Sequence, residues 1–181
     1  MSVLYTPRLE LVPITLAMVE AMMLGNREHA EAVAEARLPD AWPGTDLVER
    51  AFTASLEAIR ADPVTRLWGD RLMIVRAAGP GSTRRVIGSV VFNGRPDAEG
   101  VVEVGYGVEE GSQRAGLATE ATRACVEWAL AEPDCRAVRA TTFPWHQASL
   151  RVIEKLGMRK IGTREHDVLG EMLLFELLAS S

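Results

Sequence analysis

The chain has 181 residues, 48% of them hydrophobic and 25% charged, and a formal net charge of −5 at pH 7. This length and composition predict one globular domain over residues 1–181. The acidic balance argues against a general nucleic-acid-binding protein, because phosphate contacts need clustered lysine and arginine. No apolar run is long enough to span a bilayer, and the N-terminus lacks the apolar core of a secretory signal. We therefore expect no membrane partner and a cytoplasmic location.

The cysteines and histidines do not have the spacing of a metal site. Cys125 and Cys135 are isolated from each other and from the three histidines, so the sequence predicts neither a structural metal nor a disulfide. Cys125 falls on the apolar stripe of a predicted helix, and a buried thiol is a poor nucleophile. We therefore expect no covalent intermediate on this cysteine.

The first third of the chain is predicted to be mostly helical after one strand. Alternating residues place the strand over residues 3–13, and Thr15 and Asn26 are typical helix N-caps. A loop rich in proline and glycine is expected over residues 38–44. The expected helices run from Thr15 to about Leu24, from Asn26 to about Arg37, and from Asp46 to a point before Pro63.

The rest of the chain alternates strands with helices. Three stretches rich in β-branched residues and separated by turn signals predict an antiparallel meander, and a strand-helix-strand unit after it should contain a parallel pair. The fold class predicted is therefore α/β, with a mixed, mainly antiparallel sheet and a central βαβ unit. The expected strands are 71–77, 86–92, 101–108, 137–142, 158–162 and 171–177, and the expected helices run from Leu117 to Pro133 and from about Leu150 to Gly157.

The turn before Leu117 is the first candidate for a binding site. Gly116 lies at its centre, and the first amides of a helix have no intrahelical partner, so they favour a bound phosphate. Gly105, Gly107 and Gly111 form a loose dinucleotide pattern, but the first two lie inside a predicted strand. The sequence contains no Gly-x-x-x-x-Gly-Lys, which excludes a P-loop nucleotide hydrolase.

Four further patterns occur in the order and spacing of one known family. They are Gln113-x-x-Gly116-x-Ala118, Glu103-Val104-Gly105-Tyr106, Thr6-x-Arg8-Leu9-x-Leu11, and the stretch over residues 148–158. The first resembles the Gln/Arg-x-x-Gly-x-Gly/Ala signature of the GNAT acyltransferase superfamily, and the second its Glu-Ile-Gly-Tyr strand. The third and fourth resemble motifs of the GNAT branch that acetylates ribosomal-protein N-termini.

This resemblance implies the acyl-CoA N-acyltransferase fold and acetyl-CoA as the co-substrate. In the family, the signature turn cradles the pyrophosphate of acetyl-CoA through backbone amides. His146 replaces the family's asparagine beside the pantetheine, and an imidazole can donate a hydrogen bond there instead. The residues expected to bind the cofactor are Val108, Gln113, Arg114, Ala115, Gly116, Leu117, Ala118, Thr119 and His146.

Acetyl transfer to an amine needs a neutral amine and a stabilised leaving thiolate, and two side chains are candidates for these tasks. Glu103, in an apolar strand, is the predicted general base; the alternative is a carboxylate that faces solvent or pairs with a lysine or arginine. Ser149, in the first turn of its helix, is the predicted acid; the alternative is a helix cap. Ile153 occupies the place where many GNAT enzymes have a tyrosine acid.

Aromatic residues are the candidates for the acceptor pocket. Trp42, in the loop over residues 38–44, and Tyr106 are the predicted substrate-binding residues; Trp68 is a further candidate, and each has core packing as its alternative. The predicted function is direct transfer of an acetyl group from acetyl-CoA to the primary amine of a peptide or a small molecule. The alternative function is a non-catalytic CoA-binding regulatory module of the same fold. A homodimer is a possible assembly in either case.

Overall fold

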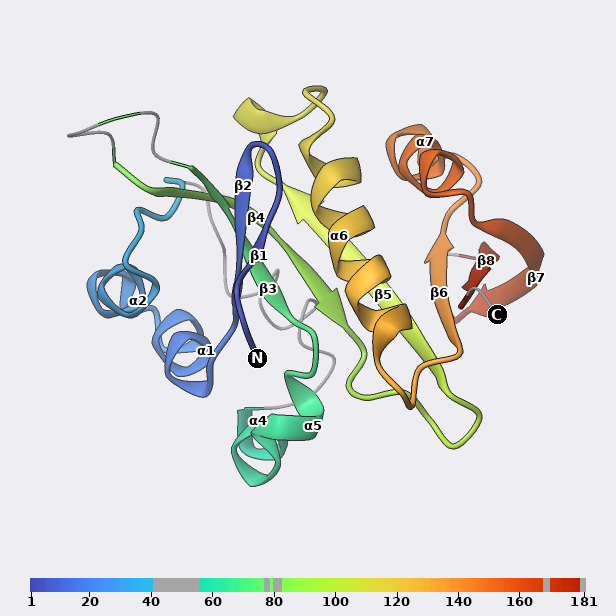
Figure 1. Ribbon diagram of the computed structural model, residues 1–181, viewed down its shortest axis with the longest axis horizontal. Coiled ribbons are helices and arrows are strands. Elements are labelled where there is room, and N and C mark those ends of the chain that lie inside the picture. Colours follow the sequence, from blue (N-terminus) through green and yellow to red (C-terminus); the bar gives the residue numbers. More distant parts are fainter. Residues whose placement is uncertain (41–55, 77–78, 80–82, 168–169, 180–181) are drawn as a thin grey trace.

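The computed structural model describes residues 1–40, 56–76, 79, 83–167 and 170–179. Within them the chain forms an eight-stranded sheet in the order β1-β2-β3-β4-β5-β6-β8-β7 (Figure 1). All neighbouring strands are antiparallel except β5 and β6, which are parallel, so the predicted mixed sheet is confirmed. The strands are β1 (Leu4–Tyr5), β2 (Leu9–Pro13), β3 (Arg71–Val75), β4 (Arg85–Phe92), β5 (Val101–Val108), β6 (Ala137–Thr142), β7 (Arg159–His166) and β8 (Gly170–Leu178).

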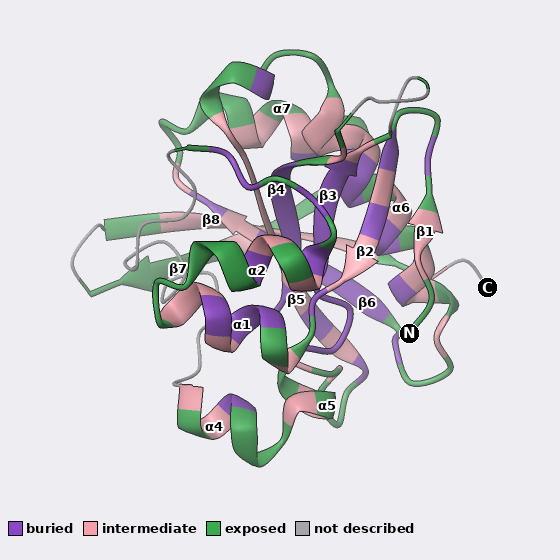
Figure 2. Ribbon diagram, turned by 90° about the vertical axis from the view of Figure 1, so that its left-hand side faces the viewer, coloured by how far each residue is buried: buried purple, intermediate pink, exposed green. Residues whose placement is uncertain are grey.

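Helices cover both faces of the sheet, and a separate apolar core lies under each layer. One core joins α6 and α7, with residues such as Cys125 of α6, to residues of β4 and β5 such as Val104. The other joins α1, α2 and α4 to strand residues such as Ile74 and Val86. Figure 2 shows the buried residues concentrated in the central strands. The helices are α1 (Leu16–Met23), α2 (Arg27–Ala34), α4 (Leu56–Ala61), α5 (Pro63–Arg66), α6 (Leu117–Ala131) and α7 (Gln147–Leu156).

The parallel strands β5 and β6 separate after a short paired region. In the described residues they pair only over Val101–Glu103 and Ala137–Arg139. Beyond Glu103, β5 continues to pair with β4, whereas β6 continues to pair with β8. The sheet therefore opens between the two strands, and α6 and α7 flank this opening (Figure 1).

The single strand predicted over residues 3–13 is wrong, because the chain folds back on itself there. β1 and β2 form an antiparallel hairpin with Leu4 opposite Leu11. The turn between them is closed by a hydrogen bond of 2.9 Å from the amide of Thr6 to the carbonyl of Leu9. Pro7 has no amide to donate to a ladder, and the Thr6 hydroxyl accepts from the Leu9 amide at 3.0 Å. Thr-Pro thus forms a turn within a β-rich sequence.

The N-terminal helices begin where their caps predict, and α1 ends at Met23, next to the predicted Leu24, whereas α2 ends early. The side chains of Thr15 and Asn26 accept from the amides of Met18 and His29, the third residue of each helix, as capping residues do. α2 stops at Ala34 instead of about Arg37, because Glu35 takes a left-handed conformation with φ 50°. The sequence missed α5, which Asp62 caps. The predicted start at Asp46 lies outside the described residues.

The described residues contain no helix long and apolar enough to cross a membrane. Cys125 and Cys135 are free and buried, and burial raises the pKa of the Cys125 thiol to about 12. A thiol with so high a pKa is hardly ionised at neutral pH, which makes Cys125 unsuitable as a nucleophile.

Candidate functional site

The connection from β5 to α6 is an exposed loop that turns twice through the left-handed region. It leaves β5 at Val108, passes through a short 3-10 helix (Glu110–Ser112) and enters α6 after Gly116. Arg114 has φ 61° and Gly116 has φ 78°. A left-handed backbone costs a non-glycine residue roughly 1–2 kcal/mol. Arg114 therefore keeps this conformation only because contacts around the loop hold it there.

The first turn of α6 presents backbone amides with no partner inside the helix. Gly116 is the N-cap and has no side chain that could cap them. The amides of Leu117, Ala118 and Thr119 thus lie at the positive end of the helix dipole. This is the geometry in which helix N-termini bind phosphate groups.

A cleft of about 510 Å³ extends from these amides to the end of β5 and along α7. Its lining includes all the residues predicted to bind the cofactor except Ala115, together with Tyr106 and Ser149. Glu103 is not part of the lining. One continuous surface thus joins the helix N-terminus to two hydroxyl groups.

The side chain of Gln113 turns back toward the protein. Its Nε2 donates to the carbonyl oxygen of Val108 at 3.0 Å, which closes the base of the loop. In the same loop, the Ser112 hydroxyl donates to the Glu109 carboxylate at 2.6 Å. The glutamine of the signature therefore shapes the loop, while the backbone amides remain the groups available to a ligand.

Tyr106 and Ser149 meet across the cleft. The Tyr106 hydroxyl lies 2.9 Å from Ser149 Oγ and 3.2 Å from the Ser149 carbonyl oxygen. The N-cap of α7 is His146, so the Ser149 hydroxyl is directed at Tyr106 and does not cap its helix. Burial raises the pKa of the Tyr106 phenol, and the hydrogen bond to Ser149 offsets part of that rise. Both hydroxyls are therefore protonated at neutral pH. One proton forms the hydrogen bond between them, and the other is available to a ligand in the cleft.

Glu103 lies on the opposite face of β5 from Tyr106, because the two residues are an odd number of positions apart. Its carboxylate pairs with Arg164 of β7 at 3.0 Å and accepts a hydrogen bond from Thr141. The side chain is 27% exposed. The structure thus contains the ion pair that the sequence left open as an alternative. Glu103 is also the last residue of β5 that pairs with β6, so it lies at the base of the opening.

Of the remaining predicted site residues, His146 lines the cleft, whereas neither tryptophan candidate is placed there by the described residues. The His146 ring nitrogen Nδ1 is 3.4 Å from the Thr142 hydroxyl. Trp42 lies outside the described residues. Trp68 is 5% exposed and packs against Phe92 and Trp128, so it belongs to the core and not to an acceptor pocket.

Sequence reasoning missed three cations near the site. Arg151 and Lys155 of α7 line the cleft, and their spacing of four residues on an amphipathic helix was a signal that could have found them. Arg164 reaches Glu103 from a strand 61 residues further along the chain, and no local pattern announces that contact.

The described residues thus combine parallel strands that separate, a helix N-terminus at the mouth of the opening, and hydroxyl groups at the far end of the cleft, an arrangement with room and amide donors for a phosphate-bearing acyl donor. The chain belongs to the GNAT acetyltransferases, because the model of the Acetyltransferase (GNAT) domain matches residues 8–159. It is an N-acetyltransferase of that family.

Known proteins with similar sequence or structure agree with this assignment. The chain is 26% identical over 159 residues to the uncharacterized N-acetyltransferase YjdG of Bacillus subtilis, covering 87% of this chain and 89% of that protein. A GNAT-family acetyltransferase from Bacillus anthracis superposes with a TM-score of 0.64 at 18% identity, over 99% of this chain and 100% of that one. RimL, a ribosomal L7/L12 α-N-protein acetyltransferase solved with coenzyme A, gives a TM-score of 0.64 at 13% identity over 98% of each chain. At such identities the two structures establish a shared fold.

Proposed function

We propose that the protein transfers the acetyl group of acetyl-CoA directly to a primary amine, on a peptide N-terminus or a small molecule. The observation that carries this proposal is the continuous cleft between the N-terminus of α6 and the Tyr106–Ser149 hydroxyl pair. It has a site for phosphate at one end and a proton donor at the other. An acyl-CoA needs both, since its pyrophosphate and its thioester are separated by the pantetheine arm.

The amides of residues 117–119 receive the pyrophosphate in this proposal, and Arg151 and Lys155 add positive charge at the same cleft. The pantetheine arm then runs along the edge of β5 that faces the opening, where amide groups can hydrogen-bond to it as a neighbouring strand would. His146 lies beside this path and is the proposed replacement for the family's asparagine. The path ends at Tyr106 and Ser149.

The chemistry assigned to these groups balances in one step. The amine nitrogen forms a bond to the thioester carbon while the bond from that carbon to sulfur breaks. Glu103 takes the proton of the amine, directly or through water, as the general base. Ser149 gives its proton to the departing sulfur, and the hydrogen bond to Tyr106 orients its hydroxyl. Glu103 then releases the proton it took to solvent and Ser149 takes one from solvent, which restores both groups. An ammonium group that approaches Glu103 competes there with Arg164.

An α-amino group of a protein is the favoured acceptor class. Support comes from the resemblance of the Thr6-x-Arg8 and residue 148–158 motifs to the branch that acetylates ribosomal proteins, and from the fold shared with RimL. A cytoplasmic location and a homodimer stay predictions.

The test is thiol release from acetyl-CoA with a panel of amines and N-terminal peptides, measured beside CoA binding by calorimetry. The proposal expects saturable release that depends on the amine, and a product acetylated on nitrogen. Tight binding of CoA without amine-dependent release would instead favour the non-catalytic CoA-binding module.

A further inference from the structure

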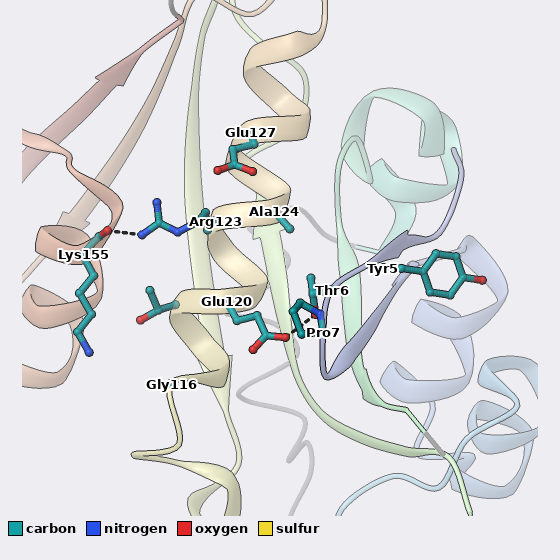
Figure 3. A pocket seen from close by; sticks show the side chains of 10 residues that line it. Tyr5, Thr6, Pro7, Gly116, Glu120, Arg123, Ala124, Glu127 and Lys155 are labelled. Atoms are coloured by element: carbon teal, nitrogen blue, oxygen red, sulfur yellow. Dashed lines mark hydrogen bonds between the residues drawn. The ribbon is translucent and has the colours of Figure 1, made fainter. Parts of the chain in front are cut away.

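The turn of the N-terminal hairpin is tied to the first turn of α6 through Glu120. Figure 3 shows Thr6 and Pro7 approaching this helix, with the Thr6 hydroxyl directed at the Glu120 carboxylate. Thr6 Oγ1 donates to Glu120 Oε1 at 2.6 Å, and the backbone amide of Arg8 donates to the same oxygen at 3.0 Å. Residues 114 positions apart in sequence are thus joined at the base of the phosphate-binding turn.

The Arg8 guanidinium completes this contact and then reaches further. Its Nε and Nη2 lie 2.7 and 2.6 Å from Glu120 Oε2. Burial by itself would raise the pKa of Glu120, but the hydrogen bonds from Thr6 and Arg8 outweigh it and hold that pKa below its usual value. The carboxylate therefore stays charged at neutral pH and fixes the plane of the guanidinium.

In this orientation the Arg8 guanidinium also contacts the loop between β5 and α6. Arg8 Nη1 donates to the carbonyl oxygen of Ala115 at 2.8 Å. Ala115 stands between the two left-handed residues, Arg114 and Gly116. Fixing its carbonyl toward the hairpin restrains the peptide plane that leads into Gly116. The amides that follow are thereby restrained in the direction they point.

The loop needs such support, because its side chains pack against little. Gln113, Arg114, Ala115 and Gly116 are all exposed. A second hollow, of about 530 Å³, lies between the hairpin, α6 and α7, and Gly116 lines both it and the cleft (Figure 3). Hydrogen bonds therefore fix this loop: Gln113 at its base and Arg8 at its tip.

We propose that Arg8, oriented by Glu120, is a positioning residue for the acetyl-CoA pyrophosphate: it holds the Ala115 carbonyl so that the amides at the start of α6 stay aligned for the phosphates. This inference rests on the proposed function. It also gives the Thr6-x-Arg8 motif a physical task, since residues two apart at the hairpin turn reach one carboxylate together. Arg8 acts through the loop and needs no contact with the cofactor.

The test compares donors with and without the pyrophosphate in Arg8→Gln, Arg8→Lys and Glu120→Gln variants. With acetyl-CoA, Arg8→Gln is expected to raise KM about tenfold or more at nearly unchanged kcat, the size expected when a charge-assisted hydrogen bond is lost. With S-acetylpantetheine, which lacks the pyrophosphate, kcat/KM should match the wild type. Glu120→Gln should show the same pattern with a smaller increase.

Arg8→Lys separates positioning from charge. Lysine keeps the positive charge but cannot span Glu120 and the Ala115 carbonyl with one planar fork, so it should lose as much as glutamine does. The matched control is Arg95→Gln, which removes an arginine of similar exposure whose ion pair with Asp134 lies at the other end of β5. Amide exchange of residues 114–118 should rise in the Arg8 variants and stay unchanged in this control.

Several outcomes would overturn the inference. Acetyl-CoA kinetics restored by Arg8→Lys would mean that Arg8 acts by its charge alone. An equal loss with both donors would mean that Arg8 supports the whole cleft and not the phosphate turn. Failure of the wild-type protein to bind CoA at all would refute the proposed function instead, so the two failures are distinguishable.

Discussion

Gly116 and Gly157 have the same backbone conformation in very different surroundings, which makes them a matched pair. Their φ angles are 78° and 76°, so alanine or a larger residue is strained at both. A Cβ on Gly116 would meet only Arg8 Nη2, at 3.6 Å, and a Cβ on Gly157 would meet nothing within 4 Å. Both positions therefore have room for a side chain in the absence of ligand.

The two glycines should nevertheless respond differently to a bulky substitution. In the proposed function the phosphates approach these amides closely, and Gly116→Leu places a side chain in their way, so we expect CoA binding to fall below detection by calorimetry. Gly157→Leu should cost similar stability, roughly 1–2 kcal/mol, and leave CoA binding intact. Wild-type affinity in a folded Gly116→Leu protein would contradict the placement of the pyrophosphate at this turn.

Ser149 and Tyr106 form one hydrogen-bonded unit, so their variants should not add. Ser149→Ala removes the proton donor and leaves no helix cap unmade, so we expect kcat to fall about 100-fold with little change in thermal stability. Tyr106→Phe keeps the ring and should lower kcat by a smaller factor. The double variant should be no slower than Ser149→Ala, because Tyr106 acts through that hydroxyl. Unchanged kcat in Ser149→Ala would exclude it as the acid.

At the scale of elements, periodicity and turn chemistry predict most of this fold. The meander, the helix from Leu117, the parallel β5–β6 pair and the Gly157 cap all follow from local patterns. The hairpin at Thr6 was missed because alternation continues across it, and Pro7 was the signal that should have weighed more. No sequence pattern predicts the separation of β5 from β6. It depends on their other partners, because β5 stays paired with β4 while β6 stays paired with β8.

The ion pair between Glu103 and Arg164 joins β5 to β7, and two variants separate its structural role from a catalytic one. Glu103→Gln keeps an acceptor for Thr141 but cannot take a proton, so kcat should fall about 100-fold or more. Arg164→Gln breaks the same pair and leaves the carboxylate, so most of the activity should remain. These are steady-state rates with a saturating amine. Equal losses in the two variants would show that the pair is structural and that the base lies elsewhere.

At the scale of the whole molecule, the site depends on contacts between segments far apart in sequence. Arg8 reaches Ala115 across 107 positions, and Arg164 reaches Glu103 across 61. Sequence patterns predicted the turn before α6 and its unpartnered helix amides, because helix N-termini are built locally. Local patterns could not identify Arg8, which contacts this turn, or Arg164, which pairs with Glu103. These contacts form only because the fold brings distant segments together.

The stability of the whole molecule should depend on pH through one carboxyl group in the core. Asp70 is 1% exposed, and burial raises its pKa to about 8 although a Phe92 amide donates to it at 2.6 Å and Arg71 lies nearby. The unfolded chain releases this proton near pH 3.8. Between these values the unfolded state binds fewer protons than the folded state. The free energy of unfolding must therefore fall as pH rises.

Asp70→Asn isolates this contribution, because the amide still accepts from Phe92 but does not titrate. The wild type should lose stability from pH 5 to pH 8 by up to about 1.4 kcal/mol per pH unit, since a single titrating group gives that slope. The variant should show a flatter profile and be the more stable protein at pH 8. Urea denaturation at each pH measures both curves. Parallel curves for the two proteins would mean that Asp70 is already ionised in the folded core. Its counter-charge would then be the buried Arg71 guanidinium, which lies 4.2 Å from the centre of the Trp128 ring.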